Sequence, residues 1–116
     1  MAELNNISGQ NCNIKYYDGN DFNLVFDVYN YYDDTAVDLT GKSLKMQIKK
    51  NKSDSTAVDE LVSGTDITIS GDDGNRLTFS KEMDLEERSY YYDLVNTTDK
   101  NTILYGMFIV TGGVTT

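Results

Sequence analysis

The chain has 116 residues, a formal net charge of -9 and a single cysteine, and it contains no histidine, proline or tryptophan. This length suits one domain with one core, and the lack of histidine excludes Ser–His–Asp and Cys–His catalysis and histidine-ligated zinc, so we expect a protein that is not an enzyme and needs no cofactor. Because a chain this acidic is repelled by phosphate backbones and anionic lipid, and because no apolar run is long enough to span a bilayer, we expect neither nucleic-acid nor membrane partners.

The N-terminal residues 1–13 are polar and carry only Leu4 and Ile7 as apolar anchors. They lack the basic and apolar regions of a signal peptide, and Cys12 cannot form an internal disulfide, so synthesis in a reducing cytoplasm is expected. The segment is either a frayed terminus or an arm that orders against a neighbouring protein. The folded domain is predicted to span residues 14–116.

Apolar and polar residues alternate along most of the remaining chain, which is typical of strands with one buried face. The pattern predicts strands at residues 14–17, 21–29, 42–50, 66–70, 76–80, 89–96 and 102–111. Residues 57–62 fit either a short edge strand or a single helical turn. Residues 81–88 have helical composition, enough for one or two turns. Seven or eight strands with regularly spaced turns predict a single all-β domain, an antiparallel immunoglobulin-like β-sandwich.

The sequence DLEERSYYYDL resembles the corner that precedes strand F of immunoglobulin-like sandwiches, with Asp84, Leu85 and Tyr90 at its positions.

The last predicted strand is apolar on both faces. Leu104, Phe108 and Val110 share one face with Gly106, which predicts a bulge or a close backbone approach. A sandwich leaves one face of each sheet outside the core, so the other row should contact another subunit or be covered by residues 1–13. The predicted partner interface consists of Ile103, Tyr105, Met107 and Ile109, extended by Tyr91 and Val95 on the neighbouring strand and by Leu4 and Ile7 in the arm.

Aspartates gather in the loops expected at one end of the sandwich, namely Asp33, Asp34, Asp38, Asp72, Asp73 and Asp99. Aspartate is common in turns because it bonds its own backbone, so we favour a solvated tip and predict no metal site. The alternatives are a Ca²⁺ site, for which Asp33, Asp34, Asp72 and Asp73 are the candidates, or a basic patch on a partner.

The order of the motifs resembles a family of small phage virion domains. The matching segments are FNLVFDVYN, VDLTGKSLKMQIKK, ITISGDDGNRLTFS, YYYDL and GMFIVTGGVT, which together cover about residues 18–115. The family includes the N-terminal domain of phage baseplate upper proteins and related β-sandwich domains of tail and head-fibre proteins. The VDLTG-x-x-L-x-M-Q-I segment is the most specific match, and it contains no active site. The long C-terminal receptor-binding region of baseplate upper proteins is absent from this sequence, which weakens baseplate attachment more than virion membership.

The resemblance implies a non-enzymatic structural component of a bacteriophage virion, made in the bacterial host cytoplasm. It would act by docking, either as a capsid decoration or head-fibre protein or as a tail or baseplate adaptor. The expected partners are other virion proteins, from the capsid, fibre, tail or baseplate, and an oligomeric arrangement in the particle is expected. The alternative is a carbohydrate- or receptor-binding module, for which the tyrosines could provide a stacking platform: Tyr16, Tyr17, Tyr29, Tyr31 and Tyr32.

Overall fold

The computed structural model describes residues 10–17, 21–29 and 34–111. These residues form strands and loops, and none of them belongs to a helix that could cross a membrane. The strands are β1 (Gln10–Asn11), β2 (Ile14–Tyr17), β3 (Asp21–Asp27), β4 (Leu44–Lys49), β5 (Asp59–Val62), β6 (Ile67–Ser70), β7 (Arg76–Glu82), β8 (Arg88–Asn96) and β9 (Asn101–Thr111).

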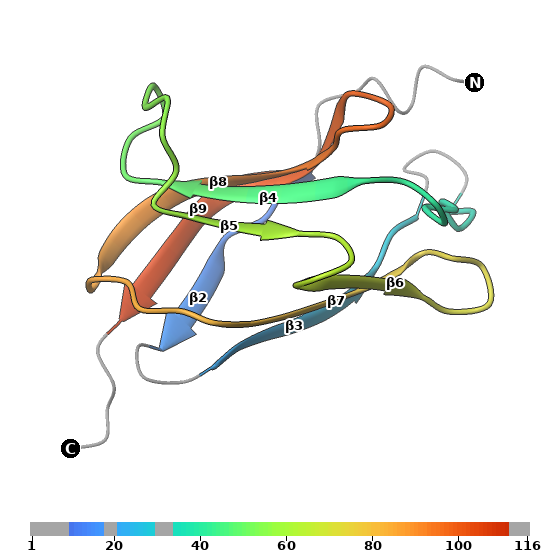
Figure 1. Ribbon diagram of the computed structural model, residues 1–116, viewed down its shortest axis with the longest axis horizontal. Helices are drawn as coiled ribbons and strands as arrows, with labels where there is room; N and C mark the ends of the chain where they lie inside the picture. The colour runs from blue at the N-terminus through green and yellow to red at the C-terminus, as the bar shows by residue number, and fades with distance from the viewer. Residues whose placement is uncertain (1–9, 18–20, 30–33, 112–116) are drawn as a thin grey trace.

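The strands build two sheets that face each other as the layers of a sandwich (Figure 1). The larger sheet has the order β9–β8–β4–β5, with β1 and β2 following one another along the free side of β9, and the smaller sheet has the order β3–β7–β6. Counted as one interrupted edge strand, β1 and β2 give the sandwich eight strand positions. The two orders match the G–F–C–C′ and B–E–D sheets of immunoglobulin domains, which confirms the predicted fold class.

The N-terminal edge is the one departure from antiparallel pairing among the described strands. β1 and β2 both run parallel to β9, whereas the other pairs are antiparallel. β1 and β2 therefore form one edge of the larger sheet, and β3 forms an edge of the smaller sheet.

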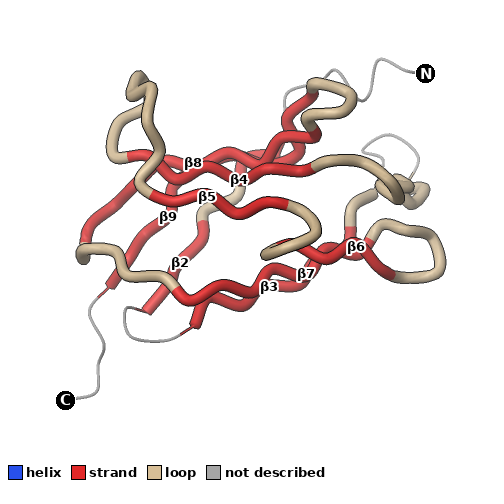
Figure 2. Tube along the Cα trace, viewed as in Figure 1, coloured by secondary structure: helices blue, strands red, loops and turns tan. Residues whose placement is uncertain are grey.

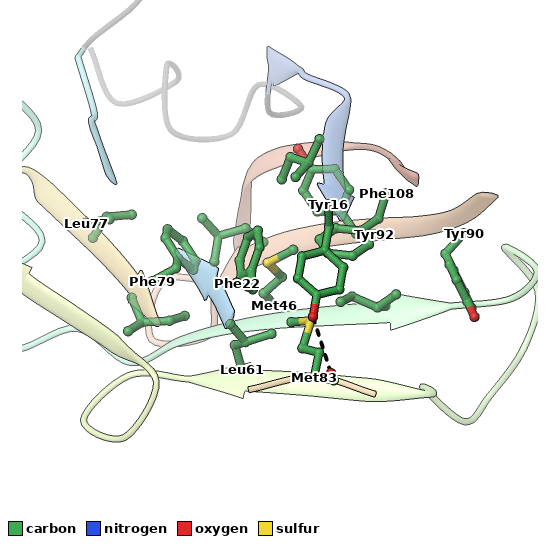
Figure 3. Packing of buried hydrophobic residues seen from close by; sticks show 14 of the residues in the cluster. Tyr16, Phe22, Met46, Leu61, Leu77, Phe79, Met83, Tyr90, Tyr92 and Phe108 are labelled. Atoms are coloured by element: carbon green, nitrogen blue, oxygen red, sulfur yellow. Dashed lines mark hydrogen bonds between the residues drawn. The ribbon is translucent and has the colours of Figure 1, made fainter. Parts of the chain in front are cut away.

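The core lies between the sheets because each strand turns alternate side chains inward. In β4, Leu44, Met46 and Ile48 are all buried, as the period of two predicts. Aromatic rings fill the space near β9, where Figure 3 shows Tyr16, Phe22, Tyr92 and Phe108 together. These four rings come from β2, β3, β8 and β9 (Figure 3), so this part of the core ties the two sheets together.

Two uncertain segments of the sequence both adopt extended structure. Residues 57–62, which fitted a strand or a helical turn, contain the edge strand β5. The helical turn predicted at residues 81–88 is wrong, because β7 continues to Glu82 and no helix follows before β8. The side chains of Met83 and Leu85 are both buried in the core. Burial of alternate residues is a period of two, which requires an extended backbone.

The corner predicted before β8 is present. The Tyr90 hydroxyl donates a hydrogen bond to the Glu86 carbonyl oxygen at 2.9 Å, and the Tyr90 ring is 1% exposed. The Arg88 guanidinium lies 5.3 Å from the centre of the same ring. A tyrosine hydroxyl bonded to backbone four residues upstream is the defining contact of the tyrosine corner in immunoglobulin-like domains.

Removing this hydroxyl should measurably weaken the domain. We expect Tyr90→Phe to lower the free energy of unfolding by about 1 to 2 kcal/mol, because the Glu86 carbonyl loses its donor in a part-buried setting. Tyr91→Phe is the matched control, since the Tyr91 ring lies on the outer side of the same strand, and it should change stability by less than about 0.5 kcal/mol. Denaturant titration measures both, and equal losses would contradict a stabilising role for the corner.

Candidate functional site

The outer face of the larger sheet is the surface for which the sequence predicts a partner. In β9, Tyr105, Met107 and Ile109 point away from the core, while Phe108 and Val110 are buried. The antiparallel register places Tyr91 opposite Met107 and Asp93 opposite Tyr105. Tyr105 is 39% exposed and Met107 and Ile109 are half-buried. The predicted row is therefore assembled on one face, with Tyr91 beside it.

One of the predicted interface residues on these two strands lies elsewhere. The register of β8 and β9 shifts between Leu94 and Val95, so Leu94 pairs with Leu104 but Val95 pairs with Thr102. Ile103 is the extra residue in this bulge, and it packs against the core next to Leu104. Ile103 is therefore wrong as a member of the outer row, because the bulge interrupts the alternation on which the prediction rested. Val95 stays half-buried on the outer side of β8, opposite Thr102.

The N-terminal segment enters the sheet earlier than the sequence predicts. Gln10 and Asn11 already pair with β9, so residues 10–13 belong to the sandwich and not to an arm. Leu4 and Ile7 lie outside the described residues, and their predicted contacts stay predictions.

Cys12 and Asn13, which separate β1 from β2, are hydrogen-bonded to β9 on either side of Gly106. The Cys12 amide donates to the Tyr105 carbonyl at 2.8 Å, and the Met107 amide donates to the Asn13 side-chain oxygen at 3.0 Å. The Tyr92 hydroxyl donates to the Cys12 carbonyl. A side chain at position 106 would collide with that carbonyl, which confirms the close backbone approach predicted for Gly106.

Burial sets the ionisation of the tyrosine that makes this contact. Burial raises the pKa of the Tyr92 hydroxyl well above its usual range, and the neighbouring Cys12 raises it further. The hydroxyl is therefore protonated at neutral pH and can donate this hydrogen bond. Its hydrogen bond holds the edge strand against β9 from inside the sandwich.

A pocket of about 440 Å³ opens on this outer face. Side chains and backbone from β9, β8, β4 and the N-terminal edge line it, together with one lysine from the loop after β4. The lining residues are Asn11, Asn13, Gln47, Lys49, Lys52, Tyr91, Tyr92, Asp93, Tyr105, Gly106 and Met107. We call this the outer-face pocket. The alternation of side chains along each strand was enough to identify Tyr91, Tyr105 and Met107 from the sequence. The contributions from β4 and residues 11–13 depend on the order of the strands in the sheet.

The outer-face pocket combines aromatic rings with a half-buried carboxylate. Burial raises the pKa of the Asp93 carboxyl, and the charge of Lys49 opposes this shift. The Lys52 ammonium lies 5.3 Å from the centre of the Tyr91 ring, within range of a cation–π contact. These groups can donate and accept hydrogen bonds and stack on a flat surface. An arrangement of this kind suits binding.

The loops that carry the aspartates do meet at one end of the sandwich, where Figure 2 shows the connections between β3 and β4, β6 and β7, and β8 and β9. The Leu39 amide bonds the Gly74 carbonyl, and Lys42 pairs with Asp99 at 3.2 Å. Among the described residues no group of three or more acidic or cysteine side chains could hold a metal ion. Asp34, Asp72 and Asp73 are exposed and belong to no such group, and Asp33 lies outside the described residues.

The VDLTG segment has an architectural role. The Asp38 carboxylate accepts a hydrogen bond from the Thr40 amide at 2.9 Å. Hydrogen bonding by the Thr40 side chain, and then by its amide, lowers the pKa of the Asp38 carboxyl. Leu39 is 3% exposed and closes the loop end of the core. A methyl group at Gly74 would lie 2.3 Å from side-chain oxygens of Asp38 and Thr40, so those side chains would have to shift. The most specific part of the family resemblance thus corresponds to a packed corner.

Among the described residues, the tyrosines proposed as a sugar-stacking platform do not lie together. Tyr16 is 3% exposed and packs in the core. Tyr17 and Tyr29 are exposed, but Tyr17 is in β2 and Tyr29 follows β3 in the other sheet. Tyr31 and Tyr32 lie outside the described residues. The aromatic rings that do line a pocket are Tyr91 and Tyr105, which the sequence assigned to a protein interface.

No family model matches the chain, and no curated protein matches it. A solved structure of the extracellular domains of the voltage-gated sodium channel beta4 subunit, described as parallel homodimers with a role in cell–cell adhesion, aligns with a TM-score of 0.40 and 17% identity, covering 91% of this chain and 95% of that chain. The immunoglobulin-like assignment is carried by the strand order and the tyrosine corner.

Proposed function

We propose that the protein is a non-enzymatic docking domain of a bacteriophage virion and that it binds a neighbouring virion protein through the outer face of its larger sheet. The observation that carries the docking part is the outward row of Tyr105, Met107 and Ile109 beside the outer-face pocket. Tyrosine and methionine are enriched at protein interfaces, and a pocket beside them can receive an anchoring side chain.

The virion part of the proposal is supported by the sequence resemblance alone. The VDLTG segment and the strand after it carry this resemblance. They form the packed corner and β4, which are parts of the scaffold that related domains would share. A capsid decoration or head-fibre protein and a tail or baseplate adaptor would both use such a scaffold. The docking proposal does not depend on which of these positions the domain takes, and repeated copies in the particle are part of it.

Saccharide binding is the second candidate, and the lining of the outer-face pocket favours it. Tyr91 and Tyr105 offer ring faces for stacking. Gln47, Asn13 and Asp93 offer amide and carboxylate groups of the kind that bind hydroxyls. A receptor-binding domain would use this pocket directly, whereas a virion adaptor would cover it.

Photo-crosslinking from the outer face tests the docking proposal in assembled particles. A photoreactive phenylalanine derivative replaces Tyr105 during phage production, and the crosslinked product from purified particles is identified by mass spectrometry. We expect a crosslink to a capsid, fibre, tail or baseplate subunit. Thr68 is the control because it is exposed on β6, in the other sheet and away from β3, and it should crosslink much less.

The possible failures separate the parts of the proposal. Absence of the chain from purified particles would overturn the virion role. Equal crosslinking from Tyr105 and Thr68 would overturn the choice of face. Binding of the purified chain to a glycan panel, lost on Tyr105→Ala, would replace docking by the saccharide function.

A further inference from the structure

Among the residues that the structure describes, the edges of the two sheets are unequally protected. Sheet edges offer unpaired backbone groups to other strands, and most proteins shorten, break or cover them. Here β5 and β6 have 4 residues each, and the Lys81 ammonium reaches the Glu60 carbonyl of β5 at 2.7 Å. The β1–β2 edge is interrupted at Cys12 and Asn13. The remaining edge, β3, has 7 residues and pairs with β7 over its whole length without a register shift.

The side chains of β3 are also incompletely covered. Leu24 and Phe26 point inward and touch the core, yet they are only partly buried, whereas the inward residues of β4 are fully buried. On the outer side, Val25 is 57% exposed at the middle of the strand. An additional strand beside β3 would cover both rows. This is the position that strand A takes beside strand B in immunoglobulin domains, whereas here the N-terminal strand pairs with β9.

Charge indicates what kind of strand fits. Asp21, at the start of β3, lies directly opposite Glu82 of β7, and both carboxylates are exposed. Like charges opposite one another in a sheet repel, so a cation placed beside them would be stabilising. Asp27 at the other end already binds Arg76, with 2.8 Å between carboxylate oxygen and guanidinium nitrogen. β3 itself contains no lysine that would repel a basic strand. A second copy of this chain, with net charge -9, fits this edge poorly.

We propose that the β3 edge accepts an extended segment of a partner protein, in which apolar residues alternate with basic ones. Backbone hydrogen bonds to β3 provide the binding, as in other cases of strand addition to a sheet edge. The apolar side chains cover Leu24 and Phe26, and a basic side chain lies beside Asp21 and Glu82. This edge belongs to the smaller sheet, so it is separate from the outer-face docking row and the two proposals can fail independently.

The test uses the full chain and a blocked synthetic peptide of about nine residues, in which valine alternates with lysine and threonine, enough to pair along all of β3. A peptide of the same composition with the alternation scrambled is the control for charge attraction alone. Binding is followed by NMR through hydrogen exchange of the β3 amides. We expect the alternating peptide to slow exchange at those β3 amides that point away from β7, and the scrambled peptide to leave them unchanged.

Three variants locate the site. Val25→Lys places a repelling charge at the middle of the edge and should weaken peptide binding by about tenfold or more. Val25→Thr keeps a β-branched side chain and should bind normally. Val58→Lys adds the same charge at an exposed valine in the loop before β5 and should also bind normally.

Each other outcome overturns the proposal. Equal effects of the two peptides would mean that only charge attraction was measured, and a response confined to the outer face would place the binding there. Slow exchange of the outward β3 amides in the free chain, lost on removing residues 1–9, would mean that the chain covers its own edge.

Discussion

Replacing Phe108 by alanine should lower the free energy of unfolding by about 3 to 5 kcal/mol, a large share of the total for a domain of this size. Phe108 is 0% exposed, and its ring centre lies 5.4 Å from that of Phe22 in the opposite sheet and 6.0 Å from that of Tyr16. Because the surrounding rings are anchored on separate strands, they cannot close the space that the missing ring leaves (Figure 3). Denaturant titration followed by circular dichroism gives the midpoint and the slope.

The adjacent residue supplies a sharp control. Ile109 points to the outer face and is only half-buried, so Ile109→Ala should cost about 1 kcal/mol. A strand register displaced by one residue would exchange the two positions. Equal effects, or a larger effect at Ile109, would therefore contradict the pairing of β9 with β8 and with it the assignment of the outer row.

The alternation of apolar residues explains how much of the fold the sequence predicts. It places β4 within two residues of its true ends and assigns Phe108 and Val110 to the core. The tyrosine corner is also predictable, because a local chain turn and one hydroxyl define it. These features depend on residues near one another in sequence. Alternation also assigns Tyr105 and Met107 to the outer face correctly.

The errors arise where distant strands decide the local structure. Composition favoured a helix at residues 81–88, but Met83 and Leu85 are drawn into the core with a period of two. The bulge opposite Leu94 turns Ile103 inward, and the residues near Ile103 in the sequence do not predict this bulge. The start of the edge strand at Gln10 depends on its pairing with β9.

The candidate site was only half predictable for the same reason. The alternation of side chains along β8 and β9 predicts that Tyr91, Tyr105 and Met107 lie on the outer face, and they form one side of the outer-face pocket. Gln47 and Lys49 join them because β4 lies beside β8, which is a matter of topology. The β3 edge is likewise a consequence of topology, since it exists because the N-terminal strand pairs with β9.

Gly106→Ala should also be strongly destabilising, with an expected loss of about 2 to 4 kcal/mol. A methyl group at this position would lie 2.5 Å from the Cys12 carbonyl oxygen and 3.0 Å from the Asn13 side-chain oxygen. The φ of Gly106 is 155°, a conformation that residues with side chains rarely adopt. Because backbone blocks the new methyl group, the domain can relieve the contact only by moving the edge strand away from β9. Denaturant titration gives the loss, and hydrogen exchange at the Cys12 and Met107 amides shows whether the edge has detached.

Gly64→Ala separates the two causes of that loss. Gly64 also has a positive φ, of 90°, but a methyl group there would meet no atom within 4 Å. This control therefore reports the conformational cost alone, which we expect to be about 1 kcal/mol, and it should leave exchange at Cys12 and Met107 unchanged. A similar loss for both variants would mean that the approach of Cys12 to Gly106 contributes little. In that case the edge strand would be held mainly by its ladder with β9, and the hydrogen bond from Tyr92 to Cys12 would be a secondary contact.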